Sequence, residues 1–341
     1  MRTLLSCIIL ALVTSCATPA HPNLQRFTSS RTEMGMEFRI TLYAPDEPTA
    51  TLAANAAFNR IQQLNAIFSD YEDDSELTTL SRSSGTSQPQ KLSPELFDIL
   101  QQAQQLSTLS SGAFDVTVGP YTSLWRRARR QKEFPREDLL NIARTRVGYQ
   151  KLHLNPANHT ATLPVERMRL DLGGIAKGYA MDEAIKTLHN LGIHSALVSG
   201  GGDLKASNPP PGSDGWRVAL TPTDNPTNAP SEFLLVKNKA VATSGDLFQF
   251  VELNGQRYSH IVNPHTGLGL TNHALITVVA NRSVTADSLS TTLSILPPKD
   301  GLMLLHHYPG SQARIAYLHG TNTIILNSRG FNQFLAPRIP N

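Results

Sequence analysis

The chain has 341 residues, 40% of them apolar, and its 30 lysines and arginines against 27 acidic residues leave a net charge of +3. This length and apolar content are typical of one large domain or two closely packed ones, and the small net charge argues against a nucleic-acid-binding surface. The basic cluster at residues 126–130 is therefore interpreted as a solvated helix face rather than a phosphate track.

The N-terminus has the pattern of a lipoprotein signal peptide. Arg2 precedes an apolar run at residues 4–13 that is too short to span a bilayer, and small residues then lead to Cys16. We expect cleavage before Cys16 and a lipid on its thiol; an ordinary cleaved signal is the alternative. The other cysteine of the chain, Cys7, leaves with the signal, so no disulfide is expected in the mature domain.

These features divide the chain into three parts. Residues 1–15 are predicted to be the signal, residues 16–31 a polar tether after the lipidated cysteine, and residues 32–341 the folded domain.

The first half of the domain is expected to alternate strands and amphipathic helices. Residues 37–43 alternate as a strand does, and residues 49–68 carry apolar side chains at helical spacing. Another helix is expected to start after Ser93, because a serine followed by proline favours a helix start.

Two loops of this half hold candidate binding residues. The acidic loop at residues 69–76 is either a capped turn or a wall of a site in which Tyr71 stacks on a planar ring. Asp115 follows a glycine turn and precedes a β-branched run, which places it at the mouth of a strand as a turn former or a functional carboxylate.

The most informative stretch is a predicted strand at residues 168–172 that runs through Gly173 and Gly174 into a helix starting at Ile175. A helix start presents unpaired N–H groups, and glycine lets a phosphate approach the backbone. The junction is therefore either an anion site or a tight packing turn. A second glycine-rich strand end at residues 200–202 favours the anion site.

The second half is predicted to be rich in strands. Strands are expected at residues 194–199, 232–242, 274–280, 313–318 and 323–327. Asn254 and Gly255 predict a hairpin between two further strands. His260 ends that hairpin, where it is either a satisfied polar group or a functional residue.

A helix predicted at residues 283–296 places Asp287 and Thr291 one turn apart and away from its leucine stripe. A carboxylate and a hydroxyl in this arrangement suit Mg²⁺, which needs only one or two carboxylates plus waters and phosphates. The alternative is an ordinary helix start in which Thr285 caps and Asp287 complements the helix dipole.

Eight short motifs occur in an order that resembles the FAD:protein FMN transferases, the ApbE family. The motifs are Met34-Gly35, residues 70–76, Gly112-Ala113-Phe114-Asp115, residues 171–178, Gly201-Gly202-Asp203, residues 242–245, residues 260–267 and residues 286–291. The likeness covers residues 32–297. It implies an α+β fold, ApbE-like and related to the T-fold, with mixed sheets flanked by helices and the nucleotide site in a central cleft.

The resemblance also implies an activity. Members of this family use Mg²⁺ to split the pyrophosphate of FAD, release AMP and attach FMN through a phosphoester to a threonine hydroxyl of a target protein. Typical targets are subunits of the sodium-pumping NADH:quinone reductase and of the Rnf complex. The implied location is the periplasmic face of the bacterial cell membrane, with the lipid on Cys16 as the anchor.

Carried onto this sequence residue by residue, the resemblance predicts the site. The metal ligands are the Gly174 carbonyl and the side chains of Asp287 and Thr291. The residues that line the flavin nucleotide are Met34, Tyr71, Ala113, Phe114, Asp115, Asp171, Lys177 and Ile261. His260 matches a family histidine near the reacting phosphate.

Several alternatives stay open at this point. The general base for the attacking hydroxyl is His260 or Asp171. The same site also suits an FAD pyrophosphatase that releases FMN and AMP, or a flavin-binding lipoprotein without catalysis. The sequence departs from the family pattern at Met36, Phe68 and Asn263, and it has Ser290 where some relatives add a carboxylate ligand.

Overall fold

A computed structural model describes residues 23–222, 230–245, 249–319 and 322–337 of the chain. The expected signal peptide and Cys16 lie outside these residues, so the lipoprotein signal stays a prediction. Within the described ranges, no helix is both long and apolar enough to cross a membrane.

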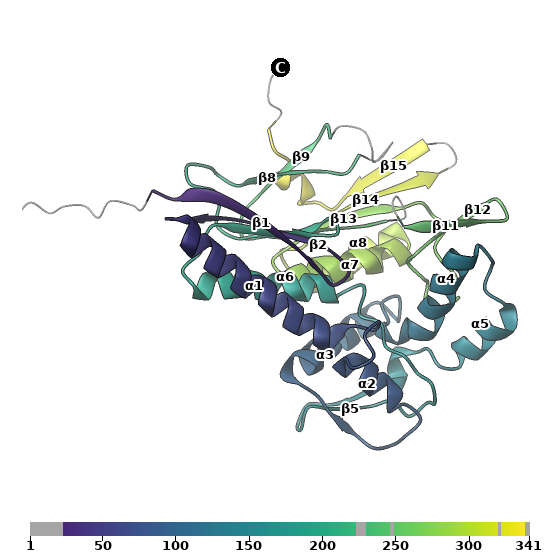
Figure 1. The fold of residues 1–341 in the computed structure, drawn as a ribbon. Coiled ribbons are helices and arrows are strands. Elements are labelled where there is room, and N and C mark those ends of the chain that lie inside the picture. The colour runs from purple at the N-terminus through teal and green to yellow at the C-terminus, as the bar shows by residue number, and fades with distance from the viewer. Residues whose placement is uncertain (1–22, 223–229, 246–248, 320–321, 338–341) are drawn as a thin grey trace, which may run out of the picture.

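An eight-stranded sheet is the centre of the fold (Figure 1). Its strands, in spatial order, are β1 (Gln25–Glu33), β2 (Met36–Ala44), β6 (Ala196–Gly200), β7 (Asp203–Ala206), β10 (Ala240–Gly245), β13 (Leu275–Ala280), β14 (Gln312–His319) and β15 (Asn322–Asn327). The pairings between neighbours in this order are antiparallel. Strand β13 is buried along its whole length, since both faces of the sheet are covered there.

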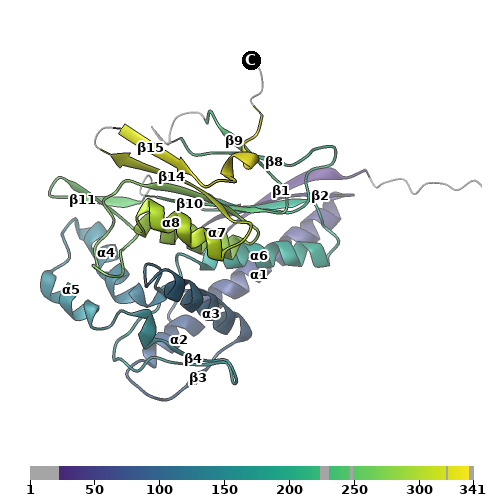
Figure 2. The same cartoon turned by 180° about the vertical axis from the view of Figure 1, so that it is seen from behind.

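Long helices cover one face of the sheet, and a small sheet covers the other (Figures 1 and 2). The helices are α1 (Glu47–Phe68), α6 (Ala176–Asn190), α7 (Ser283–Ile295) and α8 (Pro298–Leu304). The small sheet consists of β8 (Trp216–Ala219) and β9 (Phe233–Val236). The main hydrophobic core lies between the large sheet and the helices, and a separate cluster lies under the small sheet.

Two further groups of elements complete the described chain. Below the long helices lie α2 (Glu76–Arg82), α3 (Pro94–Leu109), β3 (Gln90–Lys91), β4 (His153–Asn155) and β5 (Thr160–Thr162). At the side lie α4 (Gly119–Gln131), α5 (Glu137–Arg144), β11 (Phe250–Leu253) and β12 (Gln256–Ser259). The 3-10 helices are Val116–Val118, Tyr149–Lys151, Leu305–His307 and Phe331–Phe334.

Helices α6 and α7 approach each other closely at Gly178. A Cβ atom on Gly178 would lie 2.3 Å from the carbonyl oxygen of Ser283, so only glycine fits. Asp182 of α6 caps α7 by accepting hydrogen bonds from the backbone N–H groups of Ser283 at 2.8 Å and Val284 at 3.2 Å. The capping role expected for Thr285 therefore belongs to Asp182 on a neighbouring helix.

Many local expectations are confirmed, including the α+β class. Helix α1 spans the predicted residues 49–68, and Ser93 caps α3 by accepting from the N–H of Leu96 at 3.2 Å. Asn254 and Gly255 form the turn between β11 and β12, with φ angles of 51° and 75°. These features depend on short-range turn and cap chemistry, which a sequence shows directly.

The expected tether is partly a strand. Strand β1 starts at Gln25, before the expected domain start at Thr32, and pairs with β2 along its length. Its sequence is mostly polar because it is the edge strand and one of its faces is exposed. A hydrophobic pattern could not reveal it.

Three predicted strands differ in the structure. Residues 116–118 form a 3-10 helix leading into α4, because Asp115 caps this turn and Pro120 starts the helix. Residues 168–172 form no strand ladder, and the N–H of Leu170 bonds the Ser81 hydroxyl instead. Residues 232–242 are broken into β9 and β10 by a turn at Asn238, where φ is 50°.

Candidate active site

The turn between β6 and β7 lies next to Lys177, and Met36, which follows the turn between β1 and β2, lies beside it. Met34 and Gly35 form the turn between β1 and β2, with φ angles of 51° and 75°. Gly201 lies in the turn between β6 and β7, and a Cβ atom there would be 2.8 Å from Met36 Sδ and 3.7 Å from Cδ of Lys177. The two turns and the lysine therefore form one part of the site.

Lys177 is held by two buried carboxylates. Its Nζ lies 3.0 Å from Asp287 Oδ1 and also donates to Asp203. Asp203 additionally accepts a hydrogen bond from the N–H of Thr243 at 2.9 Å. Burial opposes the charge on Lys177, but the two carboxylates outweigh it and raise the pKa of the lysine. Burial also raises the pKa of Asp203, and Lys177 opposes that effect.

Thr291, the second predicted side-chain ligand, lies against Gly174. A Cβ atom on Gly174 would be 3.2 Å from Thr291 Oγ1 and 3.4 Å from the Phe114 ring. Ser244 of β10 is close as well, with its Oγ 3.5 Å from Thr291 Oγ1 and 2.7 Å from Ser290 Oγ. The structure therefore brings Thr291 of α7 and its neighbour Ser244 beside Gly174.

Four N–H groups at the start of α6 are paired within the protein. The N–H of Gly173 donates to Asp171 Oδ1 at 2.8 Å, and the N–H of Gly178 donates to Asp287 Oδ2 at 2.9 Å. The N–H groups of Ile175 and Ala176 both bond the carbonyl of Leu172. Two carboxylates therefore pair with some of the N–H groups that were expected to cradle a phosphate, and their negative charge favours a cation at this junction.

The residues at the junction fit a divalent cation. Asp287, Thr291 and the Gly174 carbonyl all offer oxygen, the donor that Mg²⁺ prefers, and a single carboxylate among them is usual for this ion. No group of three or more His, Cys, Asp or Glu residues in the described ranges could hold a metal ion. A metal site in that part of the chain therefore depends on hydroxyl and carbonyl oxygens as well.

Asp171 is linked to Tyr71 by Arg126 of α4. The guanidinium of Arg126 lies 2.8 Å from Asp171 Oδ2, donates to Asp70, and sits 4.3 Å from the centre of the Tyr71 ring. Thr122 donates to the same Asp171 oxygen at 2.7 Å. Burial and the neighbouring Asp171 raise the pKa of Asp70, and Arg126 opposes the rise.

This network corrects one expectation. Arg126, the first residue of the basic cluster, is mostly buried, with only 19% of its side chain exposed, although the cluster was expected to be a solvated face. Arg127 and Arg130 follow that expectation, because both are exposed, whereas Arg129 is half-buried. The difference arises because two carboxylates, on segments far away in sequence, face one side of the helix.

Of residues 113–115, Phe114 lies beside Gly174. Ala113 and Phe114 are buried, and the Phe114 ring approaches Gly174. Asp115 accepts hydrogen bonds from the N–H and the hydroxyl of Thr117, both at 2.7 Å. Burial raises the pKa of Asp115 despite these bonds.

His260 and Ile261 follow β12. His260 is exposed, and its Nδ1 lies 3.0 Å from the carbonyl oxygen of Gln249, whereas Ile261 is buried. The segment after β12 is held to α4, because the indole of Trp125 donates to the Gly267 carbonyl at 2.8 Å. These two predicted residues thus stand on the hairpin that borders α4.

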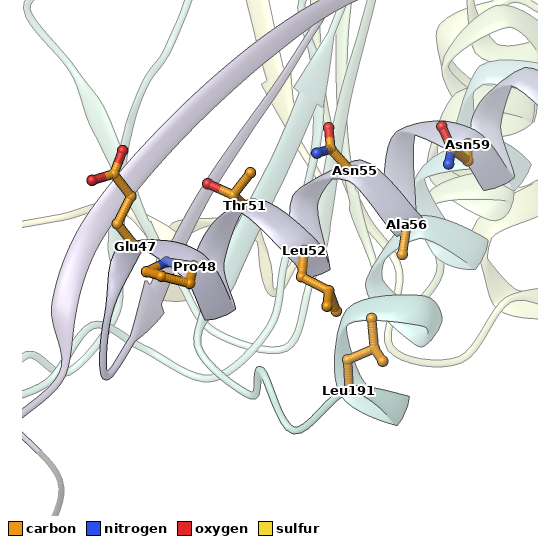
Figure 3. Close-up of a pocket in the computed structure, with 8 residues that line it drawn as sticks. All are labelled: Glu47, Pro48, Thr51, Leu52, Asn55, Ala56, Asn59 and Leu191. Atoms are coloured by element: carbon orange, nitrogen blue, oxygen red, sulfur yellow. The ribbon is translucent and has the colours of Figure 1, made fainter.

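A surface groove lies elsewhere on the molecule. It runs along the exposed side of α1 between Glu47 and Asn59 and ends at Leu191, after α6 (Figure 3). None of the predicted site residues lines it. The groove is therefore separate from the residues that carry chemistry.

Sequence reasoning had not assigned four residues of this site. They are Asp70, Arg126, Asp203 and Ser244. Asp70, Asp203 and Ser244 all lie within the quoted motifs, so a signal for them was present. Arg126 had no such signal, because its environment depends on the tertiary fold.

The fold and the site define an α+β protein in which glycine turns, ion-paired carboxylates and hydroxyl groups form one polar site. The sequence pattern of the ApbE family matches residues 34–315, and the chain belongs to this family. The FAD:protein FMN transferase of Treponema pallidum is 30% identical over 321 residues, covering 89% of this chain and 88% of the relative. That of Haemophilus influenzae is 29% identical over 306 residues, covering 87% and 88%.

Solved structures agree with the family assignment. The flavin transferase ApbE of Vibrio cholerae superimposes with a TM-score of 0.80 at 26% identity, covering 91% of this chain and 99% of that one. The ApbE flavinyl transferase of Pseudomonas stutzeri gives a TM-score of 0.79 at 27% identity, covering 91% and 97%. The α+β, ApbE-like fold is thereby confirmed.

Proposed function

We propose that the chain transfers FMN from FAD to a threonine hydroxyl of a target protein in an Mg²⁺-dependent reaction that releases AMP. The observation that supports this most is that Thr291 of α7 lies beside Gly174, with Thr291 Oγ1 3.2 Å from the position that a Cβ atom on Gly174 would take. Two predictions made from separate parts of the sequence meet there. Several relatives named FAD:protein FMN transferase share most of the chain's length.

In the proposed reaction, the threonine oxygen forms a bond to the FMN phosphorus and the bond between that phosphorus and the bridging oxygen of the pyrophosphate breaks. AMP leaves with the bridging oxygen, and the hydroxyl proton passes to a base. Mg²⁺ held by Asp287, Thr291 and the Gly174 carbonyl would neutralise charge on the pyrophosphate. Lys177, kept protonated by its two carboxylates, supplies a second positive charge beside that position.

His260 suits the role of general base better than Asp171. Both Asp171 oxygens already accept hydrogen bonds, from Gly173, Thr122 and Arg126. The carbonyl of Gln249 can only accept, so the Nδ1 atom of His260 donates to it and carries the proton. In the neutral ring, Nε2 is then the basic nitrogen. Asp171 instead fixes the glycine junction and Arg126.

The residues that we propose to contact the flavin nucleotide are Met34, Tyr71, Ala113, Phe114, Asp115, Asp171, Lys177 and Ile261. Tyr71 is 73% exposed and therefore accessible to a planar ring. We also propose a lipid anchor on Cys16 at the periplasmic face of the cell membrane, with acceptors such as subunits of the sodium-pumping NADH:quinone reductase or Rnf complexes. Mass spectrometry of Cys16 in the purified membrane fraction tests the anchor.

The test of function uses the full chain, FAD, Mg²⁺ and a threonine-bearing acceptor, and follows acceptor mass and free AMP. We expect an FMN adduct with one AMP for each adduct, and loss of both with Asp287→Ala. Free FMN and AMP with an unmodified acceptor would instead identify a pyrophosphatase. FAD binding without any AMP would leave only a flavin-binding protein.

A further inference from the structure

In the part of the chain that the structure describes, four cationic side chains at the end of α4 and just after it have no acidic partner. Residues 126–132 contain five cations and no acidic residue. Within the ranges that the structure describes, Arg126 pairs with two aspartates, whereas no carboxylate lies within 4 Å of Arg127, Arg129, Arg130 or Lys132. We call these last four residues the α4 basic surface.

Helix geometry alone does not account for this surface. Cations near a helix C-terminus are favourable because they complement the dipole. Like charges three residues apart repel, however, and Arg127 and Arg130, neither of which has an acidic partner, stand at that spacing. A cluster of this density with no acid of its own is a surface that an acidic partner would stabilise.

The α4 basic surface also borders the site. Arg129 and Arg130 follow Arg126 by one helical turn, about 5 Å along the axis, and therefore flank its side of the helix. Side chains on a helix tilt toward its N-terminus, which here is the end that carries Thr122 and its bond to Asp171. The two arginines thus lean back toward the network around Asp171.

A protein acceptor has to cover this region. Its threonine must reach the reacting phosphate, and a specific protein interface buries roughly 800 Å² per partner, a patch about 16 Å in radius. The turn after Arg126 falls inside such a footprint. A membrane lying on the same surface would block the acceptor, so the position favours a protein partner over a lipid surface.

We propose that the α4 basic surface docks an acidic patch of the acceptor protein beside its threonine. This inference rests on the proposed transferase function. It adds a determinant of acceptor choice that lies outside the FAD and metal residues: complementary charge steers the acceptor to the site and discriminates against basic proteins.

The experiment compares the full-length wild type with an Arg129→Glu/Arg130→Glu variant. The probe is the soluble domain of a flavin-carrying subunit of the sodium-pumping NADH:quinone reductase, in its natural form and with the acidic residues around its threonine changed to amides. We expect the enzyme variant to raise the KM for the natural acceptor about tenfold, with kcat and the Kd for FAD unchanged. The wild-type kcat/KM falls with added salt, and that of the variant does not.

A matched control separates docking from overall charge. Lys237→Glu/Arg329→Glu makes the same charge change at two exposed residues next to β9 and the last 3-10 helix, across the sheet from α4. We expect its KM for the acceptor to stay within twofold of the wild type. Combining the arginine variant with the amide acceptor tests the pairing directly. If the two sets of charges interact, the loss of kcat/KM caused by the enzyme change and the loss caused by the acceptor change should not add.

Each contrary result has a distinct meaning. An unchanged KM in the arginine variant overturns the proposal, as does a rise in the KM for FAD in place of the acceptor, because the surface would then serve the nucleotide. If the wild type cosediments with phosphatidylglycerol vesicles and the arginine variant does not, while the KM for the acceptor is the same in both, the surface binds lipid and the proposal is overturned. Binding of the acceptor is measured in parallel by calorimetry. If binding depends on the charges but no FMN adduct forms, the result counts against the transferase function and not against docking.

Discussion

Lys177 Nζ lies 3.0 Å from Asp287 Oδ1, so the carboxylate proposed as a metal ligand already has a cationic partner. Asp203 also accepts from Lys177, which means that the lysine keeps a carboxylate partner if Asp287 turns toward a metal ion. The three groups form a cluster in which one cation and two anions are buried together. A divalent cation bound here would bring the net charge of this cluster and an incoming diphosphate, taken together, closer to zero.

Lys177→Met should destabilise the chain by about 3–5 kcal/mol, because it leaves two buried carboxylates without their cation. Denaturant unfolding measures this loss. Mg²⁺ should restore more stability to the variant than to the wild type, since the ion then replaces the lost charge. Lys186→Met, at an exposed position on the same helix, should change stability by less than about 0.5 kcal/mol. If Mg²⁺ raised the stability of the wild type and of Lys177→Met equally, the ion would not be replacing the charge of the lysine.

Thr291→Val should weaken metal binding by about tenfold or more, because outer-shell partners alone typically account for 10- to 100-fold. The side chain keeps its shape and loses only the hydroxyl. Binding of Mn²⁺ followed by electron paramagnetic resonance, with and without FAD, measures the change. Thr292→Val is the matched control: Thr292 is the next residue, fully buried, and its hydroxyl bonds the Ser288 carbonyl. Equal metal affinity in the two variants would remove Thr291 from the ligand set.

Arg126→Met should cost about 3 kcal/mol and weaken FAD binding, because Asp70 and Asp171 lose their common partner and the Tyr71 ring loses its cation. The exposed neighbour Arg127, which bonds Gln131, provides the control Arg127→Met. Fluorescence titration with FAD in the absence of Mg²⁺ reports affinity separately from catalysis. Loss of stability with unchanged FAD affinity would show that Arg126 supports only the fold.

The sequence predicted those parts of the site that depend on short segments. Paired glycines before a helix, the Asp287/Thr291 spacing and the Asn254 turn are all readable within a few residues. The resemblance also implied that Gly174 and Thr291 lie together, as they do in the structure. Local chemistry and ordered motifs therefore carried most of the prediction.

Other features could not be predicted, because distant residues decide them. Arg126 pairs with Asp70 across 56 residues, so its burial has no local signal. The edge strand β1 is polar and depends on pairing with β2. Residues 168–172 have the alternation of a strand, yet the N–H of Asp171 bonds the Val116 carbonyl in a loop crossing, not in a ladder.

Gly178→Ala should be severely destabilising, by about 3 kcal/mol or more, because the new Cβ would meet the Ser283 backbone at 2.3 Å. Separating α6 from α7 also stretches the bond between the Gly178 N–H and Asp287. We therefore expect lower metal affinity together with lower thermal stability. A contact-free glycine, Gly192, gives the control Gly192→Ala, whose cost of about 1–2 kcal/mol comes from its left-handed φ of 80° alone. A Gly178→Ala variant as stable as this control would show that the helices can move apart.

The buried phenol of Tyr308 leads us to expect a loss of stability at alkaline pH. Burial raises the pKa of its phenol above the value of about 10 in an unfolded chain. Below that pH both states are protonated and the contribution to stability is complete. As pH rises further, the unfolded chain releases its proton first, so the free energy of unfolding falls until the folded pKa is passed. Tyr308→Phe keeps the ring and removes the proton, so the alkaline decline should become shallower while stability at pH 8 changes little. Urea unfolding between pH 8 and 11 measures both slopes, and identical slopes would show that the Tyr308 phenol is as accessible in the folded chain as in the unfolded one.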